Sequence, residues 1–296
     1  NSSDSNNNSG FGGGFGGGNN GNKPGDMNNS SGNSTKKSYS TKGIKADSEI
    51  TISGATINIS STDDGIHANS DSGVLETGED GKGTIVINGG SITISSGDDG
   101  INACTGDGKT SPIVNVTAGY IDITTASGDT DGIDSNGNYV QTGGFVLVKG
   151  GSSSGNVSGS IDVDGTVTIT GGTCVALGGV CKTPVNSANA YVLSSVSFSS
   201  GSYSLKNSSG KEVISFTVDG TFGNGWICSD TLTTGTSYTL YRGSDSIADW
   251  TQESGTMGSS GTSSFGGGKM GGMGGQNGGN APDMNGQNGG FGGGRR

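Results

Sequence analysis

Long hydrophobic runs, leucine, proline and charged residues are all scarce in this sequence. No apolar run approaches the roughly 18 residues of a membrane-spanning helix, so we expect a soluble chain without a membrane span. Seven leucines, with apolar β-branched residues in short alternating runs, argue against a helical bundle or a doubly wound α/β enzyme. Only four prolines are present, and the 63 glycines follow no three-residue period, which excludes collagen. The remaining fold class is all-β.

Basic residues are also few. Fifteen Lys and Arg residues stand against 26 Asp and Glu residues, which gives a formal charge of −11. Nucleic acid and anionic lipid are therefore not expected as partners, whereas cations are. The chain opens with Asn1-Ser2-Ser3-Asp4 rather than a basic and then apolar leader, which we interpret as the mature end of an exported chain. We therefore expect a secreted or cell-surface protein.

The cysteines include no CxxC pair. Cys104, Cys174, Cys181 and Cys228 lie far apart in the chain, so a zinc site is not expected. An even number of cysteines in an exported chain permits two disulfides, in any of three connectivities. The short chain separation of Cys174 and Cys181 favours that pair, although the sequence alone does not choose.

Composition divides the chain into four parts. We predict a Gly/Asn/Ser-rich tail at 1–38, a repeated β region at 39–185, a C-terminal β cap at 186–252 and a second Gly-rich tail at 253–296. Residues 40–180 contain seventeen acidic residues, five lysines and no arginine. The acidic character of the chain therefore belongs to the repeat.

The repeat consists of a Gly-Ile element, an alternating strand, a glycine corner and a second alternating strand. In the first copy these parts are Ile50–Ile52, Gly54-Ala55 and Ile57–Ile59, after the Gly-Ile element. Successive Gly-Ile elements are Gly43-Ile44, Asp63-Asp64-Gly65-Ile66, Asp98-Asp99-Gly100-Ile101 and Thr130-Asp131-Gly132-Ile133. Their spacing is 22, 35 and 32 residues, and the surplus falls in polar loops, so the basic rung has 22 residues.

One rung of this length cannot enclose a hydrophobic core. Rungs stacked about 4.8 Å apart bury a continuous column of Ile and Val, which is the arrangement of a parallel β-helix. Alternation then directs Ile57 and Ile59 inward and Asn58 outward, and the corner glycines supply positive φ. A flat antiparallel sandwich is the competing fold, but it gives no reason for a recurring Asp-Asp-Gly-Ile. We therefore predict a parallel β-helix.

From about residue 191 the pattern changes, and most aromatic residues outside the tails are found there. An open end of a β-helix exposes unpaired strand edges and a bare core, so we interpret this region as a cap. The alternative is a binding role, in which Trp226, Tyr241 or Trp250 forms an aromatic platform for sugar rings.

The recurring aspartates stand at the same place in successive rungs. Stacking would bring their carboxylates to within about 5 Å of one another, where they repel. Calcium, which accepts about six to eight hard oxygens, would compensate that repulsion. The candidate ligands are Asp63, Asp64, Asp98, Asp99, Asp129, Asp131 and Asp134. The alternative is that each aspartate caps the turn before its glycine by accepting a backbone N–H. His67 is expected to be a lone, outward-facing histidine.

Lys42–Ala46, Ile50–Ser60 and Asp63–Ala68 closely resemble a bacterial cell-surface carbohydrate-binding β-helix family, typified by a Clostridium thermocellum polysaccharide-binding protein. The resemblance covers about residues 40–245 and includes closing strands at 213–216 and 236–243. It implies a right-handed, pectate-lyase-like β-helix that binds calcium and adheres to polysaccharides such as polygalacturonate and cellulose, without established catalysis. The later rungs are less regular, so the carried-over ligands after Ser135 are less well supported.

A second resemblance concerns catalysis. Ser96–Ile101 and Asp129–Asp134 resemble the catalytic coils of polygalacturonases, whose carboxylates protonate the leaving oxygen and activate water. The partner motifs of those enzymes, Gly-His-Gly and Arg-Ile-Lys, are absent, and residues 40–180 contain no arginine to serve as a pectate-lyase base. We therefore expect a non-catalytic protein whose partner is an acidic or neutral plant-type polysaccharide, with a polygalacturonase-like hydrolase as an alternative.

Both tails carry a Phe-Gly-Gly-Gly motif. Its phenylalanines are Phe11, Phe15, Phe265 and Phe291. The default interpretation is a flexible tether. The alternative is that extended polyglycine strands, anchored by these rings, link subunits into a homopolymer, an extracellular filament.

Overall fold

The fold consists of β-strands. The computed structural model describes residues 41–69, 82–105, 112–150, 159–178, 181–194, 196–253 and 262–263. Every regular element within these ranges is a strand, so the all-β class is confirmed. None of the described segments is a helix of the length and apolar character that a membrane crossing requires. The predicted anchors Phe11, Phe15, Phe265 and Phe291 lie outside the described residues.

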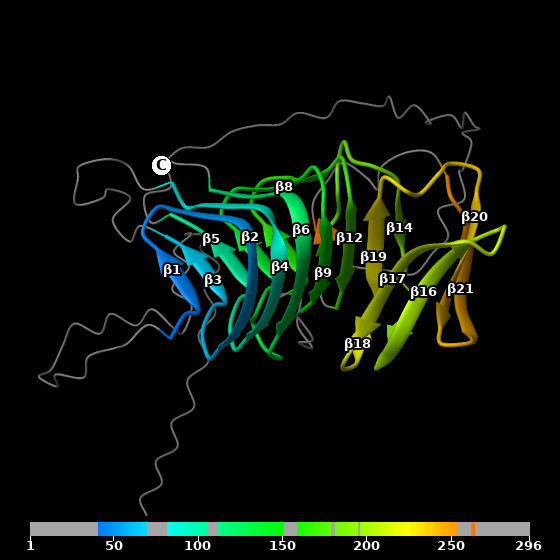
Figure 1. The fold of residues 1–296 in the computed structure, drawn as a ribbon, viewed down its shortest axis with the longest axis horizontal. Coiled ribbons are helices and arrows are strands. Elements are labelled where there is room, and N and C mark those ends of the chain that lie inside the picture. The colour runs from blue at the N-terminus through cyan, green and yellow to red at the C-terminus, as the bar shows by residue number, and fades with distance from the viewer. Residues whose placement is uncertain are drawn as a thin grey trace, which may run out of the picture. The chain divides into compact units, whose positions relative to one another are not determined.

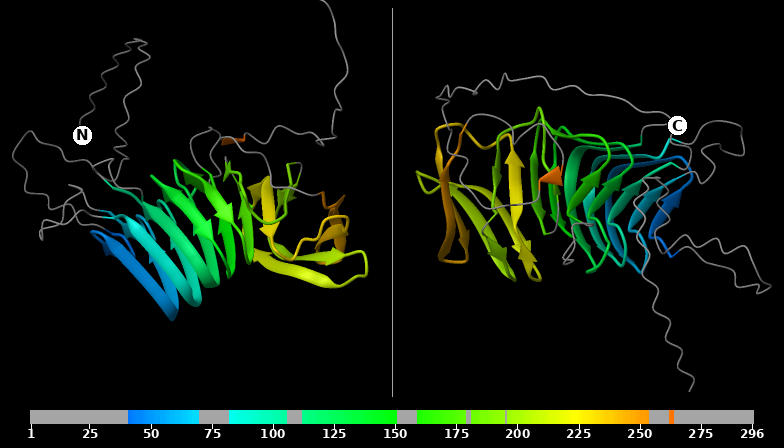
Figure 2. Two further views of the ribbon diagram at one scale, coloured as in Figure 1. Left: turned by 90° about the horizontal axis from the view of Figure 1, so that it is seen from above. Right: turned by 180° about the vertical axis from the view of Figure 1, so that it is seen from behind.

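Residues 44–177 form rows of parallel strands, which we call the parallel stack (Figure 1). Its strands are β1 (Ile44–Ala46), β2 (Glu49–Ser61), β3 (Ile66–Ala68), β4 (Thr84–Ser96), β5 (Ile101–Ala103), β6 (Ile113–Thr125), β7 (Ile133–Ser135), β8 (Asn138–Gln141), β9 (Phe145–Lys149), β10 (Ile161–Val163), β11 (Val167–Ile169) and β12 (Thr173–Leu177). Figure 2 shows the successive rungs side by side, with the colour running from blue to green along the stack.

The first row contains the predicted Gly-Ile elements. Its order is β1-β3-β5-β7-β10, and every pair in it is parallel. The isoleucines share one register position, so that Ile66 stands between Ile44 and Ile101. The fifth member, β10, was not predicted, because Ser160 stands where a glycine precedes the isoleucine in the other members.

The long strands β2, β4 and β6 pair in parallel along both of their halves. Each strand bends in the middle, where Gly54, Gly90 and Gly119 have φ between +96° and +106°. These left-handed conformations suit glycine, which has no Cβ to clash, so the predicted glycine corners are confirmed. On the far side of β6 from β4, two shorter strands replace a single long one. β8 pairs with the half of β6 before the bend, and β9 pairs with the half after it.

The inward residues of the rows form one continuous hydrophobic core, the first core. Ile92 and Ile94 of β4 are buried in it, as are Ile121 and Ile123 of β6. Ile57 and Ile59 pack against this core from β2, whereas Asn58 between them is exposed. The predicted alternation is therefore confirmed.

Residues 190–251 form the antiparallel region. Its strands are β14 (Ala190–Val192), β15 (Ser197–Phe198), β16 (Gly201–Asn207), β17 (Glu212–Val218), β18 (Phe222–Gly223), β19 (Gly225–Ser229), β20 (Ser237–Arg242) and β21 (Asp245–Thr251). Two short strands, β13 (Cys181–Lys182) and β22 (Thr262–Ser263), pair with each other. β19 pairs antiparallel with β12, so it occupies the edge of the last strand of the stack. The sheets are therefore mixed, and the parallel β-helix stays a prediction.

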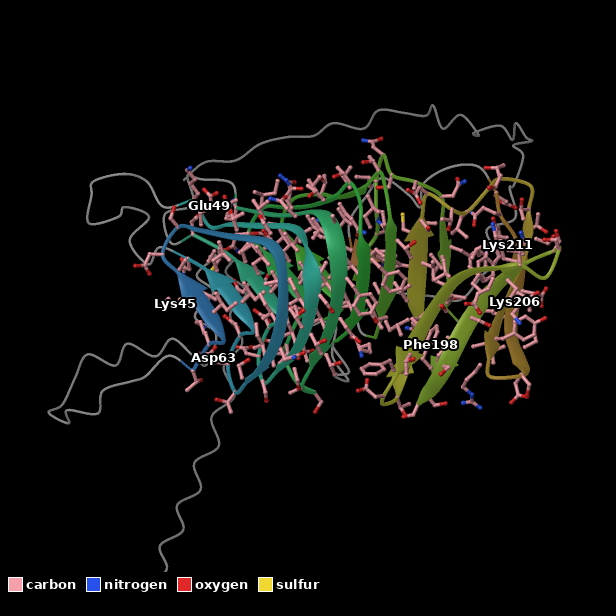
Figure 3. The ribbon with its side chains drawn as sticks, viewed as in Figure 1. Lys45, Glu49, Asp63, Phe198, Lys206 and Lys211 are labelled. Atoms are coloured by element: carbon pink, nitrogen blue, oxygen red, sulfur yellow. The ribbon has the colours of Figure 1, made fainter. Side chains whose placement is uncertain are left out.

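A second core lies between the stack and the antiparallel region. Leu147 of β9 packs there, together with Val175 and Leu177 of β12. These side chains share the core with Phe198, Leu205 and other residues of the antiparallel region. In Figure 3, Phe198 lies at the lower end of the antiparallel strands. The outer side of the last stack strands is therefore covered by the antiparallel region.

The cysteines do not form the pair that chain separation favours. Cys174 stands directly opposite Cys228 across the antiparallel pair β12–β19, and both side chains are buried in the first core. Neither thiol is part of a disulfide in the structure, and the same holds for Cys104. The preference for Cys174 with Cys181 is wrong, because strand pairing places Cys174 against β19 rather than beside its neighbour in the chain.

Candidate functional site

Three of the predicted metal ligands converge at the turns before β3 and β5. Asp63, Asp64 and Asp98 each offer a carboxylate oxygen, and these atoms lie within 4.8 Å of one another. Asp63 appears in Figure 3 near the lower end of β1. Asp64 is buried, while Asp63 and Asp98 are half-buried. Hard, converging carboxylate oxygens are the donors that calcium prefers, so this group fits a calcium ion chemically.

A lysine that the sequence analysis did not single out already neutralises part of this group. Lys42 Nζ lies 2.8 Å from Asp63 Oδ1 and 2.8 Å from Asp64 Oδ2. Burial alone lowers the pKa of Lys42, but hydrogen bonds to both carboxylates and their charges raise it above the ordinary value. Burial likewise raises the pKa of Asp64, and the hydrogen bonds from His67 and Lys42 outweigh this effect, so that the pKa is lowered.

The aspartate directly before the glycine of each Asp-Gly-Ile element accepts a hydrogen bond from a backbone N–H of the next rung. The Asp99 N–H donates to Asp64 Oδ1 at 3.2 Å, and the Asp131 N–H donates to Asp99 Oδ1 at 2.9 Å. The Gly159 N–H continues the series by donating to Asp131 Oδ1 at 2.6 Å. We call Asp64, Asp99 and Asp131 the inner aspartates. The inner aspartates therefore cap backbone N–H groups across rungs, whereas Asp63 caps the Asp64 N–H within its own turn at 2.9 Å.

Two of the inner aspartates also contact the side chain three residues later, which lies on the strand that follows. Asn102 Nδ2 donates to Asp99 Oδ2 at 2.6 Å, and His67 Nδ1 lies 2.5 Å from Asp64 Oδ2. His67 faces away from the first core, as expected, but it is only 4% exposed and contacts Asp64, so the expectation of a lone histidine is wrong. Cys104 Sγ lies 4.0 Å from His67 Nε2, which is longer than the roughly 2.6–3.2 Å expected between a catalytic nucleophile and its base.

Glycine follows each inner aspartate because the rungs approach closely there. A Cβ on Gly65 would lie 2.6 Å from the carbonyl oxygen of Gly100. A Cβ on Gly100 would lie 2.5 Å from the carbonyl oxygen of Gly132. These distances are shorter than van der Waals contact, so a larger residue would separate the rungs. The recurring Asp-Gly-Ile therefore combines a buried acceptor with a position where only glycine fits.

The other predicted ligands are spread along the same edge. Asp129 is exposed in the turn after β6, and Asp134 is half-buried on β7. Asp134 shares its register position with Asn102 on one side and Asp162 on the other. In the part of the chain that the structure describes, only Asp63, Asp64 and Asp98 form a group that could hold an ion.

The predicted sugar platform is wrong for both tryptophans. Trp226 is fully buried, and Trp250 is 7% exposed, with its ring stacked on Tyr191 at a centroid distance of 4.2 Å. Both rings belong to hydrophobic cores, where a sugar cannot reach them. Tyr241 is half-buried, and Lys206 Nζ lies 5.3 Å from the centroid of its ring.

The outward side of the second halves of β2, β4 and β6 is an exposed polar surface, which we call the outer face. It comprises three aligned sets: Thr56, Ser91 and Tyr120; Asn58, Thr93 and Asp122; and Ser60, Ser95 and Thr124. The side chains on β2 and β4 are exposed, and Tyr120 is 41% exposed. Tyr120 was not predicted as a binding residue, although an aromatic residue at an outward position of an alternating strand was a signal for one.

Comparison with known proteins finds a similarity over part of the chain. A family model described as "Carbohydrate-binding domain-containing protein" matches residues 15–79 of the chain. The described part of that segment includes β1, β2 and β3, and therefore both Asp63 and the first strand of the outer face. No curated protein and no solved structure matches the chain. The match supports a relationship to carbohydrate-binding proteins over that segment.

Proposed function

We propose that this chain is an extracellular, calcium-binding, non-catalytic polysaccharide-binding protein built on a right-handed parallel β-helix. The observation that carries the proposal is the match of residues 15–79 to a carbohydrate-binding family model. The outer face supports it, because aligned hydroxyl and amide side chains on adjacent strands offer a row of hydrogen-bonding groups to a glycan.

Calcium would bind among Asp63, Asp64 and Asp98. Asp64 is held by Lys42, His67 and the Asp99 N–H, so its position is set before an ion arrives. Asp63 and Asp98 stand half-buried beside it, and their carboxylates would supply the charge that the cation needs. Bound calcium would hold the first rungs together by adding ligands across them.

A binding role is favoured over hydrolysis by the environment of the acids. A glycosidase needs one protonated carboxyl group and one carboxylate facing the substrate. Asp99 and Asp131, which stand in the segments that resemble polygalacturonase coils, are buried and accept backbone N–H groups. These contacts give both side chains a structural role in joining the rungs.

The test is a sedimentation assay with insoluble cellulose and with calcium-crosslinked polygalacturonate, together with thermal melting in calcium and in chelator. We expect the chain to sediment with a polysaccharide, and calcium to raise the melting temperature by several degrees. The double variant Asp63→Asn, Asp98→Asn should lose the calcium-dependent shift. Asp245→Asn, at an exposed acid of the antiparallel region, is the matched control and should retain it.

The outcomes separate the parts of the proposal. Absence of binding to every polysaccharide would refute the binding role, and equal melting curves with and without chelator would refute the calcium site. Release of reducing or unsaturated sugar ends during the incubation would refute the non-catalytic role.

A further inference from the structure

Tyr120 is the large hydrophobic residue that stands exposed among the described residues, with 41% of its surface accessible. It lies on β6, in register with Ser91 of β4 on one side and Phe145 of β9 on the other. Its ring stacks on Phe145 with a centroid distance of 5.4 Å and an interplanar angle of 10°. Phe145 in turn packs against the second core, so the Tyr120 ring rests on a fixed neighbour.

The other face of the Tyr120 ring is directed toward β4, because β6 lies between β4 and β9. The residue in register there is Ser91, which is small and exposed, and Thr56 follows it on β2. An aromatic face that one aromatic neighbour supports and small residues flank is a surface on which a flat apolar face of a ligand can stack.

Hydrogen-bonding groups lie beside this ring, in the neighbouring set of the outer face. Thr93 is exposed, and the Asp122 side chain is 21% exposed. Lys149, itself 3% exposed, holds Asp122 through an Nζ–Oδ1 distance of 2.7 Å. Burial and then the charge of Asp122 raise the pKa of Tyr120, and the charge of Lys149 acts in the opposite direction. A carboxylate has about four acceptor sites, so one ion pair leaves capacity for a ligand hydroxyl.

The charge of this surface discriminates among glycans. Residues 55–61, 90–96 and 120–125, which make up the outer face, contain no lysine, arginine or histidine. The nearest cation, Lys149, is buried and lies between Asp122 and Asp219, at 2.7 Å and 3.0 Å. A uronate chain would bring carboxylates to Asp122 without a cation to receive them, which is unfavourable.

We infer that Tyr120, with Ser91, Thr93 and Asp122, forms a binding subsite for a neutral glycan. One sugar ring stacks on the open face of Tyr120, its hydroxyl groups hydrogen-bond to Thr93 and Asp122, and the chain continues over the polar residues of β4 and β2. The inference rests on the proposed function and adds to it the place of binding and a preference for neutral over acidic polysaccharide.

The test is isothermal titration of the full chain with cellohexaose and with an oligogalacturonate of the same length. Tyr120→Ala should weaken the affinity for cellohexaose about tenfold, because stacking supplies energy of that order. Tyr120→Phe keeps the ring and should retain the affinity. Tyr241→Ala removes the half-buried tyrosine of the antiparallel region, which is the rival sugar platform, and no change is expected if Tyr120 carries the stacking.

Each outcome decides the inference. It is overturned if wild type binds cellohexaose and Tyr120→Ala binds it equally well, or if Tyr241→Ala alone weakens binding. Tighter binding of the oligogalacturonate through Tyr120 would overturn the preference for a neutral glycan. Wild type that binds oligogalacturonate but not cellohexaose overturns the subsite while leaving the proposed function standing, whereas wild type that binds no polysaccharide removes both.

Discussion

The parallel stack and the antiparallel region are both built from alternating strands, but they exclude water in different ways. In the stack, each inward position repeats one kind of residue, so that Ile85, Val114 and other aliphatic side chains fill the first core in aligned columns. In the antiparallel region, single aromatic residues such as Phe198 and Tyr203 contact each other, with ring centroids 5.4 Å apart. The same packing of aliphatic side chains therefore recurs from rung to rung in the stack, whereas each aromatic contact in the antiparallel region is specific to its own residues.

The two regions meet on the outward side of the stack, where one column of residues changes character. From β2 to β12 this column reads Asn58, Thr93, Asp122, Leu147 and Val175. The first two are exposed, and the last two are fully buried in the second core. The sequence therefore marks where the outer face ends, and Tyr120 and Asp122 stand at that boundary.

The largest expected effect comes from replacing a covered residue of this column with a charged one. Leu147→Asp places an unpaired carboxylate in the second core, and we expect a loss of about 4 kcal/mol or more. Tryptophan emission should shift to longer wavelength as Trp250 becomes accessible to water. Asn58→Asp introduces the same group in the same column at an exposed position, and its effect should stay within about 0.5 kcal/mol. Equal stability of the two variants would contradict the assignment of Leu147 to a covered face.

A second test concerns the polar joints between rungs, which distinguish the stack from the antiparallel region. Asp99→Ala leaves the Asp131 N–H and the Asn102 amide without their acceptor, so we expect a loss of about 3 kcal/mol in urea unfolding. Hydrogen exchange should accelerate in β5 and β7 and less in β16 and β17. Asp129→Ala, which removes an exposed acid two positions before Asp131, is the control. A uniform acceleration would show that the two regions open as one.

The smallest expected effect comes from Lys42 and depends on pH. Its pKa is raised above 10.5, so its contribution is complete below pH 10.5 and is lost as the pH rises above that value. The pKa of Asp64 is lowered below 3.8, so its contribution is complete above pH 3.8 and is lost at lower pH. Lys42→Met should cost about 1–2 kcal/mol at neutral pH and reduce the alkaline decline.

Lys82 supplies the matched control for this prediction. It pairs with Glu49 at 3.4 Å, but its side chain is 65% exposed, so Lys82→Met should change stability by less than about 0.5 kcal/mol. Thermal melts across pH 3–11 compare the three proteins. An alkaline decline that is as steep in Lys42→Met as in wild type would exclude Lys42 as its cause.

The sequence was sufficient for the features that repeat. The alternation around Ile57 and Ile92, the glycine corners and the common register of the Gly-Ile elements all follow from spacing. The convergence of Asp63 with Asp98 was also predicted, because rungs in register bring equivalent positions together.

The environments of single side chains were less predictable. Trp226 could have been exposed or buried, and only its place between the two regions decides that it lies in the first core. His67 carries an outward-facing position in the alternation, yet its hydrogen bond to Asp64 draws the ring into a buried site. Lys42 became part of the candidate site through a contact with residues 21 and 22 positions away.

By itself, the sequence determined the all-β class, the length of the rung and the positions where glycine is required. These properties depend on local conformation and on a period that the chain repeats. Only the tertiary structure decided which aspartates serve as joints, which aromatic ring stands exposed and where the outer face is covered. Those outcomes depend on which side chain of a distant rung or strand lies opposite, and a period along the chain does not specify such a neighbour.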